Sequence, residues 1–200
     1  MIEKSNFRSD LLASLRRLPY ILRHPRRYFA DPSSAFLFDG VVIIFLLFLA
    51  TLVQKLLVVS PGSPFSKYLW AGEEALVNSL MVWSLFLAIN SLVLGLARRQ
   101  VNYPVLSGQL GVVAAPLMVC TIFSAILSLI AFFVPALAQI VLWDFLQNAL
   151  AWIGLVLSWL GLFGYFLLRD AYQLKQLWAI LIPGAALIFV LIPTVMTLFS

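Results

Sequence analysis

The feature that most constrains this chain is a series of five apolar runs, each long enough to cross a bilayer as a helix. A spanning helix needs about 20 apolar residues, and the runs occupy about 36–59, 75–97, 105–134, 145–168 and 177–199. They are too long and too continuously apolar to be the alternating strands of a membrane barrel. The sequence therefore predicts an all-α polytopic membrane protein with five transmembrane helices.

Composition supports a single membrane domain. Of the 200 residues, 63% are hydrophobic and only 10% are charged, whereas a soluble domain carries roughly 25% charged residues. A chain this short cannot bury two thirds of its residues in a core surrounded by water. We expect a basic cytoplasmic segment over residues 1–34 and a membrane domain over residues 35–200, with no cleaved signal peptide and no separate catalytic domain.

The positive charges predict the orientation, because Lys and Arg accumulate on the cytoplasmic side of a membrane protein. Eleven of the 13 Lys/Arg fall in the N-terminal segment and in the connections after the second and fourth runs, which a five-span topology puts on one side. Only Lys55 and Lys67 fall toward the other side. We therefore expect the prokaryotic cytoplasmic (inner) membrane, with the N-terminus in the cytoplasm and the C-terminus outside.

Residues 10–23 combine leucines with arginines in a helical pattern. Four leucines share one face of such a helix: Leu11, Leu15, Leu18 and Leu22. The pattern is typical of an amphipathic helix that lies in the membrane interface, either kinked at Pro19 or ending by Leu18. The segment is either a simple topology anchor or a docking site for a partner or for anionic lipid headgroups. The candidate interface residues are Arg16, Arg17, Arg23, Arg26 and Arg27.

Small residues recur every four positions in the third and fourth runs, a spacing that lets helix backbones approach closely. The predicted packing residues in the third run are Ser107, Gly111 and Ala115. In the fourth run they are Gly154 and Ser158, which are four positions apart, and Gly161, which follows them. These faces would act either within one chain or between chains of a homo-oligomer. Two polar residues, Asn90 and Gln109, lie toward the cytoplasmic ends of adjacent runs, where they could hydrogen-bond as ordinary contacts between helices.

No motif for catalysis, for a cofactor or for a metal site is visible. The single histidine, His24, lies among arginines, and the single cysteine, Cys120, lies within an apolar run. The acidic residues Glu73, Glu74 and Asp144 fall at run ends, where they either gather around a cation or are simply solvated. We predict a protein that is not an enzyme, and the net charge of +5 is concentrated where anionic lipid, rather than nucleic acid, would meet it.

Four segments together resemble the prokaryotic branch of the Yip-domain family, membrane proteins named for their interaction with Ypt/Rab GTPases in eukaryotes. They are the basic lead at residues 22–29, the stretch from Gly108 to Pro116, the run with Trp152, Trp159 and Gly161, and the connection at residues 169–172. The resemblance covers roughly residues 20–200 and implies a five-span fold with a membrane-organising or trafficking-like role. The chain has neither the long N-terminal region nor the Asp-Leu-Tyr-Gly-Pro motif of eukaryotic members, so GTPase binding is not carried over.

Three interpretations of the function stay open. The leading one is a non-enzymatic membrane protein that binds a partner or assembles with itself. The second is a small transporter, channel or lipid-moving protein, in which Pro116, Pro183 and Pro193 would mark broken helices. The third is an accessory membrane subunit of a larger complex.

Overall fold

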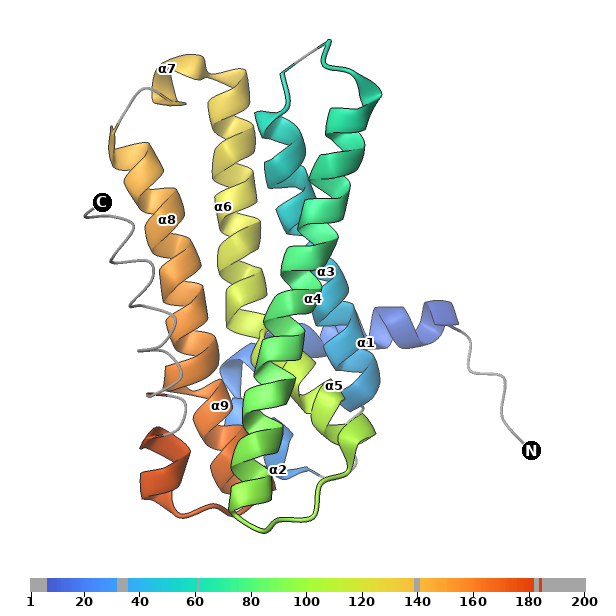
Figure 1. Ribbon diagram of the computed structural model, residues 1–200, viewed down its shortest axis with the longest axis vertical. Coiled ribbons are helices and arrows are strands. Elements are labelled where there is room, and N and C mark those ends of the chain that lie inside the picture. The colour runs from blue at the N-terminus through green and yellow to red at the C-terminus, as the bar shows by residue number, and fades with distance from the viewer. Residues whose placement is uncertain (1–6, 32–35, 61, 139–140, 182–183, 185–200) are drawn as a thin grey trace.

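The computed structural model describes residues 7–31, 36–60, 62–138, 141–181 and 184. The regular secondary structure in these residues is entirely helical, with no strand, which confirms the all-α prediction. Long helices stand side by side, and α1 lies crosswise against them (Figure 1). The elements are α1 (Phe7–Arg23), α2 (Pro25–Ala30), α3 (Phe36–Val58), α4 (Phe65–Leu96), α5 (Tyr103–Val113), α6 (Ala115–Phe133), α7 (Pro135–Ala138), α8 (Val141–Val156), η1 (Leu157–Gly161), α9 (Phe163–Phe166) and η2 (Leu167–Ala171).

Three helical segments among the described residues are long and apolar enough to cross a membrane: Phe36–Val58, Phe65–Leu96 and Tyr103–Phe133. They correspond to the first three predicted runs. Large apolar side chains on their outward faces stay exposed, and Leu37, Val41 and Phe45 on α3 each keep more than half of their surface accessible. A continuous apolar surface of this kind is what a bilayer, rather than water, would cover.

The second predicted run is part of a longer helix. Helix α4 starts at Phe65, directly after Pro64, and not at about 75. Proline fixes the backbone angle that the start of a helix needs, and the polar residues that follow it are compatible with continuing helix. The helix ends where Arg98 adopts a left-handed conformation, with φ of 54°. The Arg99 N–H then bonds to the Leu94 carbonyl at 3.0 Å, which closes the last turn in the manner of a Schellman motif.

The third run is interrupted, as the proline in it predicts. Helix α5 ends at Val113 and α6 begins at Ala115, so the break falls just before Pro116. Proline has no N–H to donate to the preceding turn and its ring crowds that turn, which explains the position of the break. The two halves lie at different angles in the bundle (Figure 1).

The fourth run is helical but irregular. Helix α8 passes into a π-helical turn at η1, and α9 passes into a second one at η2. Each π turn carries one extra residue per turn and therefore redirects the side chains that follow it. The fifth predicted run, 177–199, lies largely outside the described residues. Within this run the structure describes residues 177–181 and 184, and these are helical.

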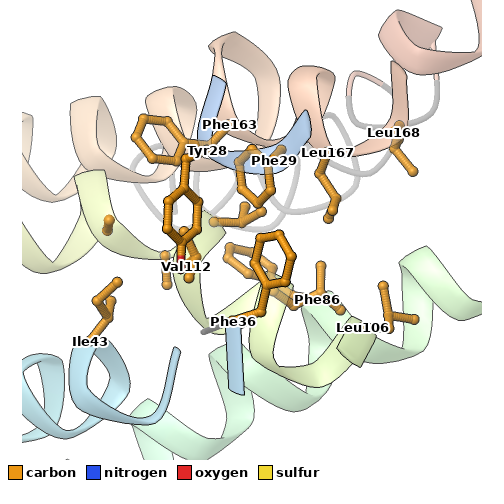
Figure 2. Close-up of a cluster of buried hydrophobic side chains, with 14 of the residues drawn as sticks. Tyr28, Phe29, Phe36, Ile43, Phe86, Leu106, Val112, Phe163, Leu167 and Leu168 are labelled. Atoms are coloured by element: carbon orange, nitrogen blue, oxygen red, sulfur yellow. The ribbon is translucent and has the colours of Figure 1, made fainter. Parts of the chain in front are cut away.

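A cluster of buried aromatic and aliphatic side chains lies where α2, α5, α9 and η2 meet the first turn of α3. Phe29 stacks on Phe36 with ring centroids 6.2 Å apart, and the edge of Phe163 meets it at 6.3 Å. Figure 2 shows these rings among Leu106, Leu167 and other buried side chains. Aromatic contacts of this geometry add to the stabilisation from buried area, so the short helix α2 is held firmly to the bundle.

Candidate functional site

The most elaborate polar site in the described residues surrounds Asp39, in the first turn of α3. Its side chain is completely buried. Arg17 of α1 donates Nη2 to Oδ1 at 2.6 Å and Nε to Oδ2 at 3.0 Å. Ser14 of α1 donates its hydroxyl to Oδ1 at 2.5 Å, and Tyr28 of α2 donates its hydroxyl to Oδ2 at 2.6 Å. We call these four residues the Asp39 clasp, because they join α1, α2 and α3.

The clasp provides a hydrogen-bond partner for each oxygen of the Asp39 carboxylate. A buried carboxylate is stable only when it is paired and its oxygens accept hydrogen bonds, and here both oxygens do. The pKa of Tyr28 is raised, first by burial and then by the hydrogen bond to Asp39, so this hydroxyl stays a donor at neutral pH. The hydrogen bond to Asp39 also raises the pKa of Arg17. The clasp is closed to substrates and acts as a joint between helices.

The clasp determines which face of α1 meets the bundle. Ser14 and Ile21, seven residues apart on the helix, are both fully buried. Leu15 and Leu22, which begin the adjacent face, are each 37% exposed. The helix continues without interruption through Pro19 as far as Arg23, so the alternative in which it ends by Leu18 is wrong. The bundle therefore covers one face of α1 completely and the leucine face only in part, since Leu18 packs against the core while Leu15 and Leu22 stay partly exposed.

The five candidate arginines have separate environments. Arg17 is held by Asp39, whereas Arg16, Arg23 and Arg27 are exposed. Arg26 lies on α2 with its Nε 3.5 Å from Oδ2 of Asp170 in η2, a longer ion pair whose arginine side chain is 63% exposed. Four of the five guanidinium groups thus remain on the surface of the described residues, where anionic groups can reach them.

The small residues predicted to pack do so within one chain, though not as one stripe. Gly111 meets Gly40 of α3 so closely that an added Cβ would lie 2.6 Å from the Gly40 Cα. Gly108, three residues earlier on α5, makes a similar contact, because its added Cβ would lie 2.5 Å from the Leu37 backbone. Ala115 is fully buried, but Ser107 is only half-buried. The contact between α3 and α5 is therefore made by Gly108 and Gly111, with Gly40 opposite them.

A second close contact joins α6 and α8. A Cβ on Gly154 would lie 2.8 Å from the Cys120 Cβ. Ser158 is fully buried, and its Oγ accepts the Leu117 N–H at 3.0 Å. That N–H belongs to the first turn of α6, whose donors have no partner within the helix. Gly161 is different, because the nearest atom to its added Cβ is a flexible leucine carbon at 3.7 Å, an ordinary contact.

The two predicted polar residues inside the runs do not meet. Asn90 donates its side-chain amide to the Phe86 carbonyl of its own helix at 2.8 Å. Gln109 accepts a hydrogen bond from the Tyr172 hydroxyl at 2.9 Å. Burial raises the pKa of Tyr172 to about 12, so it remains a donor. Gln109 therefore ties α5 to the connection after η2 and not to α4.

The acidic residues at the run ends do not form a cation site in the described part of the chain. Glu74 is bound by Lys55, and neighbouring Glu73 is exposed. The side chain of Asp144 lies outside the described set. Among the residues that the structure describes, no group of three or more His, Cys, Asp or Glu could hold a metal ion.

Sequence reasoning missed the Asp39 clasp. Asp39 looks like an ordinary charge at a run end, and its partners lie 11 to 25 positions earlier in the chain. One signal was available: Ser14 and Arg17 are three residues apart and so share one side of a helix. Comparison with known proteins adds nothing to this geometry, because no family model, no curated protein and no solved structure matches the chain.

Proposed function

We propose that this chain is a non-enzymatic integral membrane protein of five spans, similar to the Yip type, which binds a partner or assembles with itself in the bilayer. Its N-terminus is cytoplasmic, and α1 lies in the interface of the cytoplasmic (inner) membrane. The role that suits this design is membrane organisation or a trafficking-like function. The single observation that carries the proposal is that the Asp39 clasp fastens one face of α1 while Leu15 and Leu22 stay partly exposed and Arg16 and Arg23 stay exposed.

The sides of α1 support an interfacial position. Successive residues turn by about 100° around a helix, so the fastened face at Ser14 and Ile21 is followed by the leucine face at Leu15 and Leu22. The exposed Arg16 and Arg23 come next around the helix. With the bundle beside α1 and acyl chains against the leucines, the arginines point along the membrane surface toward phosphate groups. This arrangement matches the demands of an interfacial helix.

The grouping of basic residues supports the orientation. Arg99 donates a hydrogen bond to the Gln173 carbonyl at 3.0 Å, and Arg26 pairs with Asp170. The connections after α4 and after η2 therefore share one end of the bundle with α2 (Figure 1). This is the end that the positive-inside rule assigns to the cytoplasm.

Partner binding would use surfaces other than the small-residue faces. Gly111 and Gly154 are already occupied by contacts within the chain. The surfaces that remain are the uncovered sides of α1 and the outward apolar faces of α3 and α4. A second copy or a membrane partner would meet the protein there.

Crosslinking and native mass measurement in lipid nanodiscs test this proposal. The wild-type protein is expected to appear as an oligomer or with a stoichiometric membrane partner. The double variant Arg16→Ser with Arg23→Ser should weaken that association, while Arg98→Ser with Lys67→Ser, a matched loss of two surface charges, should leave it intact. A protein that is strictly monomeric and without a partner in every lipid composition would remove the proposal.

A lipid-moving or transporting role is the second candidate, and one observation favours it. An apolar groove between α3 and α4 lies next to a cavity whose wall includes the polar residues Gln109, Asp170 and Gln173, at one end of the bundle. Lipid-scrambling and ion-flux assays in liposomes decide the matter, since a folded protein without either activity would exclude this role. An accessory subunit of a larger complex would instead show itself by the partner that accompanies the protein during purification.

A further inference from the structure

A groove of about 350 Å³ runs along the outer side of α3 and α4. Its floor is the bare backbone of Gly40 and Gly108, where the two helices α3 and α5 touch. Its walls are apolar side chains at helical spacing, among them Val41, Phe45, Leu76 and Leu80. Val41 and Phe45 each keep more than half of their surface exposed. The groove is therefore open along its length to whatever surrounds the bundle.

The polar groups on the groove wall are already satisfied. Ser79 donates its hydroxyl to the Ala75 carbonyl at 2.9 Å. Trp83 donates its indole N–H to the Ser107 carbonyl at 3.0 Å, and the Ser107 hydroxyl bonds to the Pro104 carbonyl at 2.9 Å. Each of these three donors is already used within the protein, and the remaining groove walls are apolar, so the groove fits an apolar chain.

Beside one end of the groove lies a second cavity of about 890 Å³. Leu37 and Val41 line both spaces, so the two lie next to each other. The walls of this cavity include the polar residues Gln109, Asp170 and Gln173. An apolar groove next to a cavity that holds polar residues matches an amphiphilic ligand, which has an apolar chain and a polar head.

The cavity has an acidic residue in its wall, and an exposed arginine of α2 lies beside that residue. Asp170 lines the cavity with its side chain 13% exposed, and Arg26 places its Nε 3.5 Å from Oδ2 of that carboxylate. At this distance the two groups attract each other, but Oδ2 accepts no hydrogen bond. A ligand that brings a phosphate to the exposed Arg26 and an ammonium group to the accessible part of the Asp170 carboxylate would complement both charges.

We propose that the groove and the cavity together bind one bilayer phospholipid whose headgroup carries an amine. One acyl chain lies between α3 and α4, the phosphate meets Arg26 and the ammonium group meets Asp170. This inference rests on the membrane location argued above. Because an acyl chain gains little by leaving other acyl chains for an apolar groove, selectivity comes from the charged end and from the fit of the chain over the glycine floor.

Native mass spectrometry tests the site on the full-length protein in nanodiscs of equimolar phosphatidylethanolamine and phosphatidylglycerol. The wild-type protein is expected to retain one phosphatidylethanolamine after gentle removal of bulk lipid. Val41→Trp fills the junction of groove and cavity and should lower retention about tenfold, equivalent to about 1.4 kcal/mol. Val77→Trp makes the same change on α4 at an exposed position outside the groove lining, and it should retain the lipid.

A second variant examines the headgroup. Asp170→Asn keeps the shape of the side chain and removes its charge, so the preference for phosphatidylethanolamine over phosphatidylglycerol should disappear while a lipid is still retained. Retention of no lipid by an inserted wild-type protein, equal retention by the two tryptophan variants, or a wild-type preference for phosphatidylglycerol would each overturn this inference. A chain that carbonate extracts from membranes would instead overturn the proposed function itself.

Discussion

The two ends of α3 carry the same kinds of interaction with opposite degrees of burial. At its first turn Asp39 is fully buried and held by Arg17, and the next residue, Gly40, touches the backbone of α5. Near its last turn Lys55 pairs with Glu74 of α4, but both side chains are more than a third exposed. Close by on α4, a Cβ added to Gly72 would make only an ordinary van der Waals contact, at 3.9 Å.

The difference shows that residue type alone does not tell whether an ion pair holds two helices together or only lies on the surface. Exposed ion pairs contribute about 0–1 kcal/mol, because water screens them and the side chains lose freedom. A buried pair is different, since removing one partner leaves a charge without solvent or hydrogen bonds. The structure concentrates its specific contacts at the first turn of α3, and the other end remains comparatively loose.

The largest effect is expected from Gly40→Ala. The new methyl carbon would lie 2.2 Å from the Gly108 carbonyl oxygen, a backbone atom that cannot rotate away. Overpacking costs about 1–3 kcal/mol of folding free energy, and this position should lie at the upper end. Gly72→Ala, the control, should be neutral or stabilising, because alanine is the better helix former. Unfolding by denaturant in detergent micelles measures both, and equal effects would contradict the asymmetry of α3.

Arg17→Ala should be next, with a loss of about 2 kcal/mol in folding free energy. This is below the range for a fully buried pair, because the Arg17 side chain is 37% exposed. We expect α1 to loosen, so that limited proteolysis cuts the chain between α1 and α3 faster. Lys55→Ala should change stability by less than about 1 kcal/mol. Should the two variants have the same unfolding midpoint and the same cleavage rate, the clasp would not hold α1.

Ser158→Ala extends the comparison to a buried contact without charge. It leaves the Leu117 N–H without an acceptor, which costs about 1–2 kcal/mol. Ser79→Ala is the matched control, because Ser79 is also buried but bonds only to a carbonyl of its own helix. Thermal unfolding with hydrogen exchange at the start of α6 distinguishes the two. Exchange that is unchanged in the Ser158 variant would show that another group protects this N–H.

The last prediction concerns Tyr28, which has the smallest effect at neutral pH because its titration matters only in alkali. The pKa of Tyr28 is raised in the folded protein above the ordinary value of 10, so above pH 10 the unfolded chain loses this proton first. Stability should therefore fall as the pH rises above 10, with a limiting slope of about 1.4 kcal/mol per pH unit for one such group. Tyr28→Phe should flatten the decline, and Tyr172→Phe should flatten it only up to about pH 12. A decline of the same slope in Tyr28→Phe would place the titration elsewhere.

Much of the architecture follows from one-dimensional patterns. Apolar length predicted the helices that include α3, α4 and α5–α6, and Pro116 marked the break between α5 and α6. The spacing of Gly154 and Ser158 pointed to their close contact with another helix. Such features depend on neighbours within a few turns of the same helix, which is why a single sequence reveals them.

The remaining features depend on contacts between distant segments. The Asp39 clasp joins α1, α2 and α3, and nothing in the sequence near Asp39 separates it from a solvated charge. Gly40 was not predicted to be a packing residue, because its partners Gly108 and Gly111 are supplied by another helix. The partner of Gln109 is Tyr172, 63 positions away, and not Asn90. Pairing of this kind is set by how the helices cross, which periodicity does not specify.

The central claim is that α1 is fastened to the bundle and lies in the membrane interface. Spin labels placed singly at residues 15, 16, 21 and 22 test it most directly, in a Cys120→Ala background and in reconstituted membranes. The account predicts that oxygen reaches the labels at 15 and 22, that a water-soluble nickel complex reaches the label at 16, and that neither reaches the label at 21. Equal access of the nickel complex to all four labels would contradict it.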